Sequence, residues 1–358
     1  MRVVFVGWRG MVGSVVRQRI GETGDWSDVD WAFASTSSVG EPGPDGAPLV
    51  DAHDLDVLRS ADVVLTCQGS AYTLDVHGPL RNAGWQGIWL DASSALRLQP
   101  SSLLVLDPMN GAALEAGLAR GVRDFCGPNC TVSLMLMAIG ALYRQGWVSW
   151  VHASTYQAAS GAGARQMTEL VSQWRAAARG KGESALAMGD AVTSILRSPE
   201  LPQAALGGPL AGNVLPWIDV AMPDGSTREE HKAHVESQKI LGLAEPVPVD
   251  GVCVRVGALR CHSQALAIGL TQDVPLDEIE QVLSESHAWL DLVPNEREAT
   301  LSRLTPVAVT GSLQVPVGRL RRYRTPHPVL GCFTLGDQLL WGAAEPLVRW
   351  LSRLRELR

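Results

Sequence analysis

The amino terminus combines a strand, a glycine-rich turn and a helix, and this combination restricts the possible folds of the chain more than any other feature. Arg2–Val6 is a short apolar segment that predicts a buried strand. The next apolar residues fall at helical spacing, at Val12, Val15, Val16 and Ile20. Between them stand Gly7, Gly10 and Gly13. Glycines in this context allow a tight turn and a close approach of backbone to a pyrophosphate. Their spacing is GxxGxxG rather than GxGxxG, so the context, more than the glycines, predicts a dinucleotide site.

The second predicted strand indicates which dinucleotide is bound. Asp30–Ala34 is followed by the hydroxyl side chains Ser35–Ser38, where an NAD site usually carries a carboxylate for the ribose hydroxyls. Arg9 in the glycine turn supplies a positive charge. Hydroxyls and a cation suit a 2′-phosphate, so the sequence favours NADP over NAD. An ordinary polar turn is the alternative.

Further apolar strands alternate with helices over the first 125 residues. Strands are predicted at Asp62–Thr66, Gly87–Asp91 and Leu103–Leu106, and a helix at Tyr72–Ala83. Alternation of this kind predicts an α/β fold with a Rossmann-type, doubly wound parallel sheet. Its ligands are expected beyond the carboxyl ends of the strands, near Gly7, Ser35, Gln68 and Ser93.

The pattern changes in the second part of the chain. Longer strands, separated by long helices, are predicted at Val148–Tyr156, Val252–Val256 and Gln264–Leu270, which indicates a mixed α+β catalytic and dimerisation domain. Residues 180–216 are poorly periodic and are interpreted as a dimer arm or a surface loop. The last helix, Ala343–Leu357, has one apolar stripe and is expected to cover the first domain. We therefore expect an NADP-binding domain of residues 1–129 with 344–358, and a second domain of residues 130–343.

Composition excludes several classes of protein. A chain of 358 residues is long enough for two domains. Its net charge of −7 argues against a protein that binds nucleic acid. No apolar run approaches a membrane span, and the first strand begins directly after Met1, so we expect no signal peptide. Six cysteines without CxxC spacing predict neither a zinc site nor a disulfide framework. The sequence thus predicts a cytoplasmic protein with reduced thiols, no metal, and no nucleic-acid or membrane partner.

One cysteine stands where reactive thiols are found. Pro128–Thr131 leads directly into the apolar run Val132–Ile139, which predicts a buried helix that starts at Cys130. Unpaired N–H groups and the helix dipole favour the thiolate at that position. The alternative is a buried structural thiol, which is common for an isolated cysteine.

Seven segments, in order along the chain, carry a resemblance to a known family. The chain resembles the aspartate-β-semialdehyde dehydrogenases, in particular their Gram-negative bacterial branch, over essentially its full length. The matching segments are Gly7–Gly13, Thr66–Gly69, Asn129–Met137, Thr155–Gly161, Val249–Gly251, Cys253–Gln264 and Gly336–Pro346.

The resemblance implies a reaction and its catalytic residues. The reaction is the reversible, NADP-dependent reductive dephosphorylation of aspartyl-4-phosphate to aspartate semialdehyde and inorganic phosphate. It belongs to the biosynthesis of lysine (through diaminopimelate), methionine, threonine and isoleucine. Cys130 is the implied nucleophile, which forms a thioester, and His262 the general acid/base. Gln157 is expected to hold the substrate or the thioester. The family also implies a homodimer. A histidine or glutamine at a strand end is otherwise often a satisfied polar residue.

The resemblance also implies how the substrate is held. Arg255, in an otherwise apolar strand, is expected to bind the substrate carboxylate, although a structural salt bridge is the alternative. Glu236 is expected to meet the substrate ammonium, and Lys239 with Arg97 the phosphate. Glu236 and Lys239 share a helix face, so a solvated ion pair is the simpler interpretation. Asn129 is the remaining implied substrate residue.

The resemblance also implies which residues contact the cofactor. The implied residues are Arg9, Gly10, Met11, Val12 and Gly13 at the pyrophosphate, Thr36 and Ser37 at the 2′-phosphate, Gln68 along the dinucleotide, and Ser160, Gly161, Ala162, Gly163 and Gln338 at the nicotinamide. Ala162 departs from the family pattern, because many relatives carry a further glycine there.

Three other functions stay open at this stage. An N-acetylglutamyl-phosphate reductase shares the cysteine–histidine chemistry, but an ammonium site at Glu236 argues against an acylated amine. A non-phosphorylating aldehyde dehydrogenase needs a base for water and no anion site at Arg97 and Lys239. A catalytically inactive NADP sensor fits poorly with a chain that keeps Cys130 and His262 together with Gln157 and Arg255.

Overall fold

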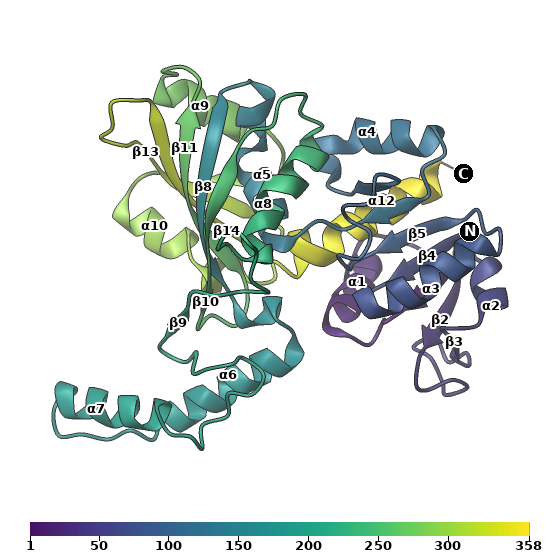
Figure 1. Cartoon of the computed structure of the whole chain (residues 1–358), viewed down its shortest axis with the longest axis horizontal. Coiled ribbons are helices and arrows are strands. Elements are labelled where there is room, and N and C mark those ends of the chain that lie inside the picture. The colour runs from purple at the N-terminus through teal and green to yellow at the C-terminus, as the bar shows by residue number, and fades with distance from the viewer. Residues whose placement is uncertain (358) are drawn as a thin grey trace. The chain divides into compact units, whose positions relative to one another are not determined.

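The computed structural model describes residues 1–357, which form two compact units (Figure 1). The first unit comprises Met1–Met137, Val235–Pro246 and the segment from Leu339 onward, and the second comprises Ala138–His234 and Val247–Gln338. Two helices contribute residues to both units, α5 (Cys130–Arg144) and α8 (Arg228–Leu241).

The first unit is built on a seven-stranded sheet whose pairings are all parallel, in the order β3-β2-β1-β4-β5-β7-β6. Its strands are β1 (Arg2–Val6), β2 (Asp30–Ser35), β3 (Val50–Asp51), β4 (Val63–Thr66), β5 (Ile88–Asp91), β6 (Ser102–Leu104) and β7 (Asp124–Cys126). Its helices are α1 (Met11–Glu22), α2 (Leu55–Arg59), α3 (Ser70–Asn82), α4 (Asp107–Ala119), the π-helix η2 (Leu340–Ala344) and α12 (Glu345–Glu356), together with parts of α5 and α8. The predicted doubly wound sheet is confirmed.

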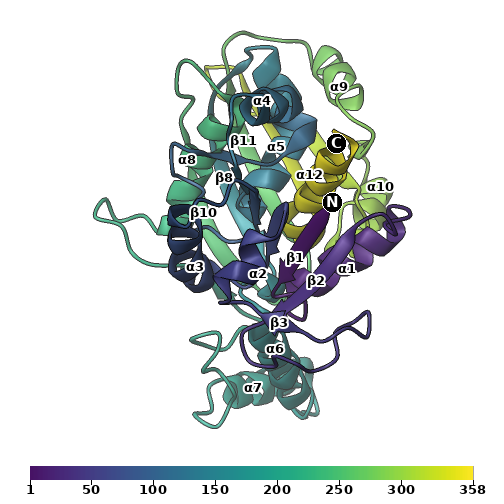
Figure 2. The ribbon, with the colours of Figure 1, turned by 90° about the vertical axis from the view of Figure 1, so that its right-hand side faces the viewer.

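Helices cover both faces of this sheet (Figure 2), and its central strands β1 and β4 are buried almost throughout. On one face Phe5 and Leu65 pack with Leu347 and Trp350 of α12. On the other face lie side chains from α2 and α3, with Trp89 at the centre. The last helix of the described chain therefore covers the first unit, as its apolar stripe predicts.

Two glycines of the turn after β1 are required by close backbone contacts. Gly7 has φ +75°, and a Cβ atom there would lie 2.6 Å from the backbone of Cys67 and Gln68. A Cβ at Gly13 would lie 2.2 Å from the carbonyl oxygen of Gly7. Gly10, the N-cap residue of α1, has only an ordinary contact at 3.4 Å. Close backbone contacts therefore explain Gly7 and Gly13, whereas no such contact requires a glycine at position 10.

The second unit contains a mixed seven-stranded sheet of order β12-β13-β14-β11-β8-β10-β9, in which β8 lies parallel to β10 and antiparallel to β11. Its strands are β8 (Val148–Gln157), β9 (Val214–Leu215), β10 (Val249–Val256), β11 (His262–Leu270), β12 (Leu290–Leu292), β13 (Val315–Arg322) and β14 (Val329–Gly336). Its helices, besides parts of α5 and α8, are η1 (Ala159–Gly161), α6 (Ala164–Ala177), α7 (Ala185–Leu196), α9 (Leu276–Ser284), α10 (Arg297–Arg303) and α11 (Pro306–Val309). The predicted mixed architecture is confirmed.

Helices α6 and α7 extend away from the sheet of the second unit (Figure 1). α7 lies within residues 180–216, whose weak periodicity gave no prediction of a helix. None of its residues is buried, and Leu186 is 82% exposed. This explains the weak pattern, since a helix without a buried face needs no apolar stripe. Over residues 1–357, every helix is too short or too polar to cross a lipid bilayer.

Candidate functional site

The carboxyl ends of β1 and β2 carry a cluster of hydroxyl and guanidinium groups. Ser35, at the end of β2, accepts hydrogen bonds on Oγ from the N–H groups of Ser37 and Ser38, at 3.2 and 3.0 Å. Arg9 Nη2 donates to the same oxygen at 3.1 Å. Thr36 accepts on Oγ1 from the amide of Gln68, at 3.2 Å. The structure thus brings Arg9, Thr36, Ser37 and Gln68 to one edge of the sheet, with no carboxylate among them.

A buried carboxylate at the end of β5 was missed in the sequence. Asp91 is fully buried and accepts from Thr73 Oγ1 at 2.8 Å and from the Ser93 N–H and hydroxyl at 2.7 and 2.9 Å. Burial raises its pKa above the ordinary aspartate value. The sequence could have indicated this site, because an aspartate at the end of an apolar strand is buried and needs hydrogen-bond donors nearby. Asp91 fixes the start of the loop that leads to Arg97.

Cys130 is the first residue of α5, a helix buried along almost its whole length. Asn129 caps this helix: its Oδ1 accepts from the Thr131 N–H at 3.0 Å, the Thr131 hydroxyl at 2.6 Å and the Val132 N–H at 3.2 Å. Cys130 itself is partly exposed, whereas the residues that follow it are buried. The predicted position of the thiol at a helix start is confirmed.

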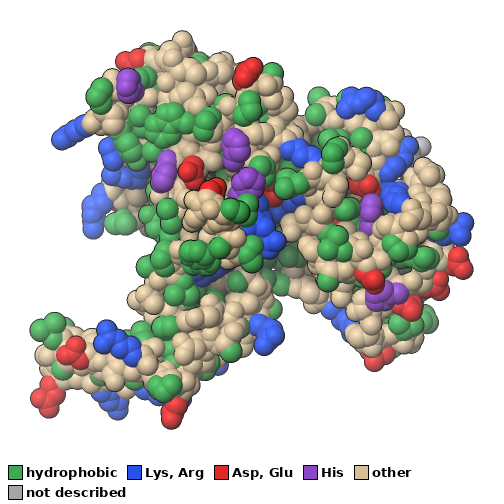
Figure 3. All heavy atoms as spheres, in the orientation of Figure 1, with side chains coloured by type: hydrophobic (Ala, Val, Ile, Leu, Met, Phe, Trp, Pro, Cys, Tyr) green, Lys and Arg blue, Asp and Glu red, His purple; other side chains and the backbone are tan. Residues whose placement is uncertain are grey.

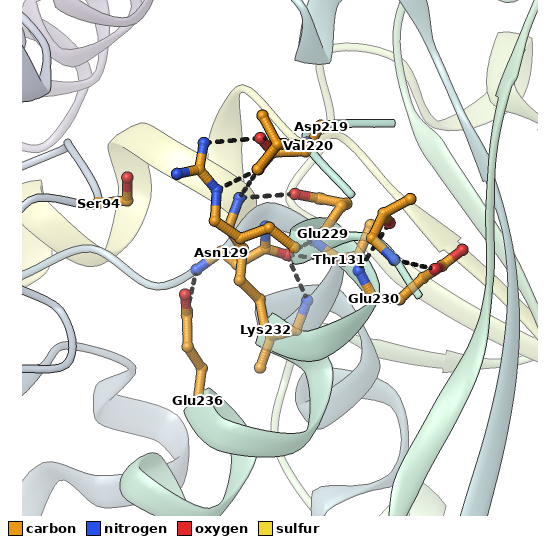
Figure 4. Close-up of polar contacts among 12 residues, drawn as sticks. Ser94, Asn129, Thr131, Asp219, Val220, Glu229, Glu230, Lys232 and Glu236 are labelled. Atoms are coloured by element: carbon orange, nitrogen blue, oxygen red, sulfur yellow. Dashed lines mark hydrogen bonds and ion pairs between the residues drawn. The ribbon is translucent and has the colours of Figure 1, made fainter. Parts of the chain in front are cut away.

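A buried ion pair lies beside the start of α5. Glu236 Oε2 accepts from the Asn129 N–H at 2.6 Å (Figure 4), and its Oε1 pairs with Arg97 Nη1 at 3.2 Å. Burial alone would lower the pKa of Arg97, but the neighbouring Glu236 carboxylate raises it above the ordinary value. The guanidinium therefore stays charged next to Cys130 and favours its thiolate.

Lys239 holds the loop that carries Arg97. Its Nζ donates to the carbonyl oxygens of Arg97 and Gln99, at 2.6 and 2.7 Å, and to Ser102 Oγ at 3.0 Å. Burial lowers its pKa, although the nearby Cys126 and Glu236 oppose this effect. The solvated pair of Glu236 with Lys239, which was the simpler interpretation of the sequence, is not seen: Glu236 pairs with Arg97, and Lys239 binds the loop.

In the second unit, the backbone of Ala158 forms hydrogen bonds with two of the predicted site residues. The Ala158 N–H donates to His262 Nδ1 at 3.1 Å, and the Ala158 carbonyl oxygen accepts from Arg255 Nη1 at 2.8 Å. His262 is fully buried and Arg255 is 8% exposed. Burial, and after it the Arg255 charge, lower the pKa of His262 to about 3, although Glu229 and the backbone of Cys261 act in the opposite direction. The imidazole is thus held neutral.

Gln157 contacts a carboxylate that sequence reasoning also missed. Its Nε2 donates to Thr155 Oγ1 at 3.2 Å and to Glu229 Oε1 at 3.4 Å. Glu229 pairs through its other oxygen with Lys232 at 2.9 Å, and Lys232 with Asp219 at 2.9 Å (Figure 4). Because the carboxylate only accepts, Gln157 must turn its NH₂ group toward it. No local sequence pattern signals this long-range contact.

The turn after β8 holds the predicted nicotinamide residues. The amide of Gln338 donates to Ser160 Oγ and accepts from the Cys261 N–H at 2.8 Å. A Cβ at Gly161 would lie 2.7 Å from His262. Gly163 has φ +125°, whereas Ala162 has φ −90°. Alanine therefore replaces the family's glycine at 162 without backbone strain.

The predicted residues thus gather in separate groups within the units. Cys130, Asn129, Glu236, Arg97 and Lys239 belong to the first unit, as do the cofactor residues that precede them; Gln157, Arg255, His262, the Ser160–Gly163 turn and Gln338 belong to the second. Over residues 1–357 no group of three or more His, Cys, Asp or Glu side chains is arranged to hold a metal ion.

Parallel sheets of this strand order bind dinucleotides where the order reverses, which here is the edge beyond β1 and β4. The contacts at that edge fit a dinucleotide, and the fold and site therefore define a dinucleotide-binding protein. Two family models match the chain: "Semialdehyde dehydrogenase, NAD binding domain" over residues 2–117, and "Semialdehyde dehydrogenase, dimerisation domain" over residues 139–341. The chain belongs to the semialdehyde dehydrogenase family, as its sequence motifs predict.

Solved structures agree with this assignment. Aspartate semialdehyde dehydrogenase from Francisella tularensis is 45% identical over 99% of this chain and 100% of its own, with a TM-score of 0.97. Aspartate semialdehyde dehydrogenase II from Vibrio cholerae, complexed with ASA, is 22% identical over 99% and 98% of the two chains, with a TM-score of 0.81. The Candida albicans enzyme with NADP is 16% identical over 100% and 99%, with a TM-score of 0.68. The last two show the fold alone.

Proposed function

We propose that the protein catalyses the reversible, NADP-dependent reductive dephosphorylation of aspartyl-4-phosphate to aspartate-4-semialdehyde, through a thioester on Cys130. The observation that carries the proposal is the partly exposed thiol at the capped start of α5, with the buried Arg97 charge beside it. The 45% identity to the Francisella tularensis enzyme supports the choice of substrate.

The thiolate performs the first step. Sγ of Cys130 attacks the acyl carbon, a C–S bond forms, and the C–O bond to phosphate breaks, so that inorganic phosphate leaves. The helix dipole of α5 and the Arg97 guanidinium stabilise the thiolate before attack. In the reverse direction the same thiolate adds to the aldehyde and gives a thiohemiacetal.

The substrate is proposed to be held by charged groups of both signs. The Arg255 guanidinium matches a planar carboxylate, and Glu236 an ammonium group. Arg97, whose Nε has no hydrogen-bond partner among residues 1–357, supplies the charge for the phosphate. Lys239 supports this anion site by holding the loop of Arg97, and Asn129 supports it through the cap of α5.

Cofactor binding is proposed at the edge beyond β1 and β2. Arg9 to Gly13 would hold the pyrophosphate, Thr36 and Ser37 the 2′-phosphate, Gln68 the dinucleotide, and the Ser160–Gly163 turn with Gln338 the nicotinamide. When bound, NADPH supplies the hydride that reduces the thioester. His262 is the proposed acid/base group for the oxygen of the reacting carbonyl, and Gln157 orients the acyl group.

One assay tests this proposal directly. With aspartate semialdehyde and NADP, the protein is expected to form NADPH only when inorganic phosphate is added. Formation of NADPH without phosphate would indicate a non-phosphorylating aldehyde dehydrogenase, and activity only with an N-acetylated semialdehyde would indicate an N-acetylglutamyl-phosphate reductase. The route to lysine, methionine and threonine and the cytoplasmic location stay predictions of the sequence.

We also propose that the protein is a homodimer that uses the sheet of the second unit. Large apolar side chains are exposed on neighbouring strands of that sheet: Trp150 and Tyr156 on β8 and Val252 on β10. They point to one face, because the residues of β8 between them, such as Val151 and Ala153, are buried. An apolar face of this kind usually marks a protein–protein contact. The match of residues 139–341 to a dimerisation domain supports a second copy as the partner.

A further inference from the structure

The Ala158 peptide and the glycine at 161 determine how His262 can act. We infer that they hold His262 as a neutral ring protonated on Nε2, which takes part in the reaction as a hydrogen-bond donor to the oxygen of the reacting carbonyl. This inference rests on the proposed function but revises the acid/base role given to His262 there: the ring donates a hydrogen bond from Nε2 and keeps its proton.

The position of the ring proton follows from one contact. Nδ1 of His262 faces the Ala158 N–H at 3.1 Å, and an N–H can only donate. Nδ1 must therefore accept, and in a neutral imidazole the proton then resides on Nε2. Turning the ring over would replace Nδ1 by a carbon and leave a buried amide without an acceptor. A proton on Nδ1 would set two donors against each other.

The charges around the ring favour the neutral form. The Arg255 charge on β10 opposes a positive charge on the ring, whereas Glu229 of α8 and the backbone of Cys261 act in the opposite direction. Burial is the largest contribution, and together these effects lower the pKa of His262 to about 3. The imidazole is accordingly neutral throughout the range in which the protein would work.

The protonated nitrogen lacks a partner. Nε2 is buried and has no hydrogen-bond partner in the described part of the chain. Leaving a buried donor unpaired costs about 1–3 kcal/mol, so such a group indicates an absent acceptor. In the proposed reaction that acceptor is the carbonyl oxygen, which gains negative charge as hydride or thiolate adds. A neutral imidazole can polarise a carbonyl in this way.

Gly161 packs against the Nε2 edge of the His262 ring, where no side chain would fit. A Cβ atom there would lie 2.7 Å from Nε2 and Cε1 of His262 and 2.9 Å from Nη1 of Arg255. Gly161 has no positive φ, so backbone conformation does not explain the glycine. We therefore assign Gly161 as a positioning residue for His262 and Arg255, in addition to any contact with the cofactor.

Two substitutions of the histidine separate donation from proton transfer. His262→Gln keeps an N–H near the place of Nε2 but carries no titratable proton. His262→Asn reaches only as far as Nδ1, so it keeps an acceptor for Ala158 and no donor toward the substrate. For a neutral donor we expect the Gln variant to keep kcat within about 30-fold of wild type, and the Asn variant to lose about 100-fold or more. Equal losses of ~10²–10⁴ in both variants would overturn the inference, because an obligatory proton carrier is lost in either.

A spectroscopic measurement tests the ring itself, independently of turnover. The eight histidines of the full-length protein are labelled with ¹⁵N, and the His262 signals are assigned by their absence in His262→Gln. We expect the Nε2–H tautomer without titration from about pH 5.5 to 8.5. A ring that titrates in this range, or that carries its proton on Nδ1, would refute the inference even if the proposed reaction is confirmed. Loss of the reaction with this tautomer intact would refute only the proposed function.

The role of Gly161 is tested by a pair of alanine variants. Gly161→Ala should change the ¹⁵N shifts of His262 and lower kcat about 10-fold or more, since the ring must move. Gly78→Ala in α3 is the control, because a Cβ there meets nothing within 4 Å. His262 shifts that are the same in Gly161→Ala as in wild type would contradict the positioning role.

Discussion

At the residue scale, Cys130 differs from the other cysteines in its surroundings. Burial raises the pKa of Cys67 and Cys126 well above the ordinary thiol value, and that of Cys261 and Cys332 to about 12. Such thiols are inert at neutral pH. Cys130, which is partly exposed like Cys67, differs in that it stands at a helix start with electrostatic contact to Arg97. The position of Cys130 at a helix start could be predicted from sequence, because a Pro-Asn pair stands directly before it and an apolar run follows.

A serine variant tests this assignment. Cys130→Ser should lower kcat by several orders of magnitude, because an alcohol is a far weaker nucleophile at neutral pH, while the dissociation constant for NADPH stays nearly unchanged. Steady-state kinetics and fluorescence titration of NADPH measure the two quantities. Cys126→Ser, at a buried thiol four residues earlier, serves as the control and should remain active. Near-normal turnover in Cys130→Ser would exclude thioester chemistry at this residue.

Arg9 provides a second test at the same scale. Its guanidinium donates to Ser35 next to the backbone of Ser37, where we place the 2′-phosphate. A charged hydrogen bond contributes about 1.5–3 kcal/mol, so NADPH should bind at least ~10-fold more tightly than NADH. Arg9→Gln should remove most of this preference and leave NADH binding unchanged. Arg17→Gln is a matched control, since this guanidinium also stacks on Trp8 but is not assigned to the cofactor. Equal dissociation constants for both cofactors in wild type would contradict the assignment.

At the element scale, the start of α5 depends on a single side chain. Asn129 Oδ1 accepts three hydrogen bonds from Thr131 and Val132. Loss of such a cap costs about 0.5–2 kcal/mol. Asn129→Ala should lower the free energy of unfolding by this amount and also reduce kcat, because Cys130 shares the same turn. Denaturant titration and kinetics measure both. Asn129→Ser, which can still cap, should restore most of the stability; an alanine variant as stable as wild type would show that the cap contributes nothing.

The pairing of α3 with β7 predicts a pH dependence of stability. Burial raises the pKa of Asp124, but hydrogen bonds from His77 and Arg81, at 2.8 and 2.6 Å, outweigh it and leave the pKa below its usual value. A lowered acid pKa contributes stability above the unfolded value of about 3.9 that is lost as pH falls through the folded value. The stability difference between wild type and Asp124→Asn should therefore be present at pH 5 and shrink toward pH 2. Asp75→Asn, at an exposed carboxylate of α3, should show no such change. A difference that grows in acid would contradict this account.

At this scale the sequence predicts those elements that are specified by residues close together in the chain. The strand β1, the glycine turn and helix α5 were predicted because periodicity and breakers within a few residues specify them. Short elements with little apolar pattern, such as β7 and α7, were not. The pairing of Arg97 with Glu236 spans 139 residues, so only the fold reveals it. Most site residues came from family resemblance, and the contacts that orient them came from the structure.

At the scale of the whole molecule, the exposed apolar face of the second sheet needs a partner. Trp150 and Tyr156 are each 39% exposed and Val252 is 43% exposed, in strands that are otherwise well packed. The arm of α6 and α7 adds exposed apolar side chains such as Leu186, and Figure 3 shows hydrophobic atoms at its outer end. Stable interfaces bury more than about 1,000 Å² in total, and a sheet face supplies an area of this order. In a dimer with two-fold symmetry the same surface of each copy lies in the contact. The apolar sheet face of one copy would then be covered by the same face of the other.

Introducing a charge on the face tests whether two copies meet there. We expect wild type to sediment at twice the chain mass at micromolar concentration. Tyr156→Asp should give monomers, because a carboxylate buried in the contact without a partner costs several kcal/mol. Val307→Asp is the matched control: this valine of α11 is 91% exposed, belongs to the same unit and does not lie on the sheet. Circular dichroism must show that both variants fold. If Tyr156→Asp still sediments as a dimer while folded, the sheet face is not the interface, and the arm of α6 and α7 becomes the next surface to test.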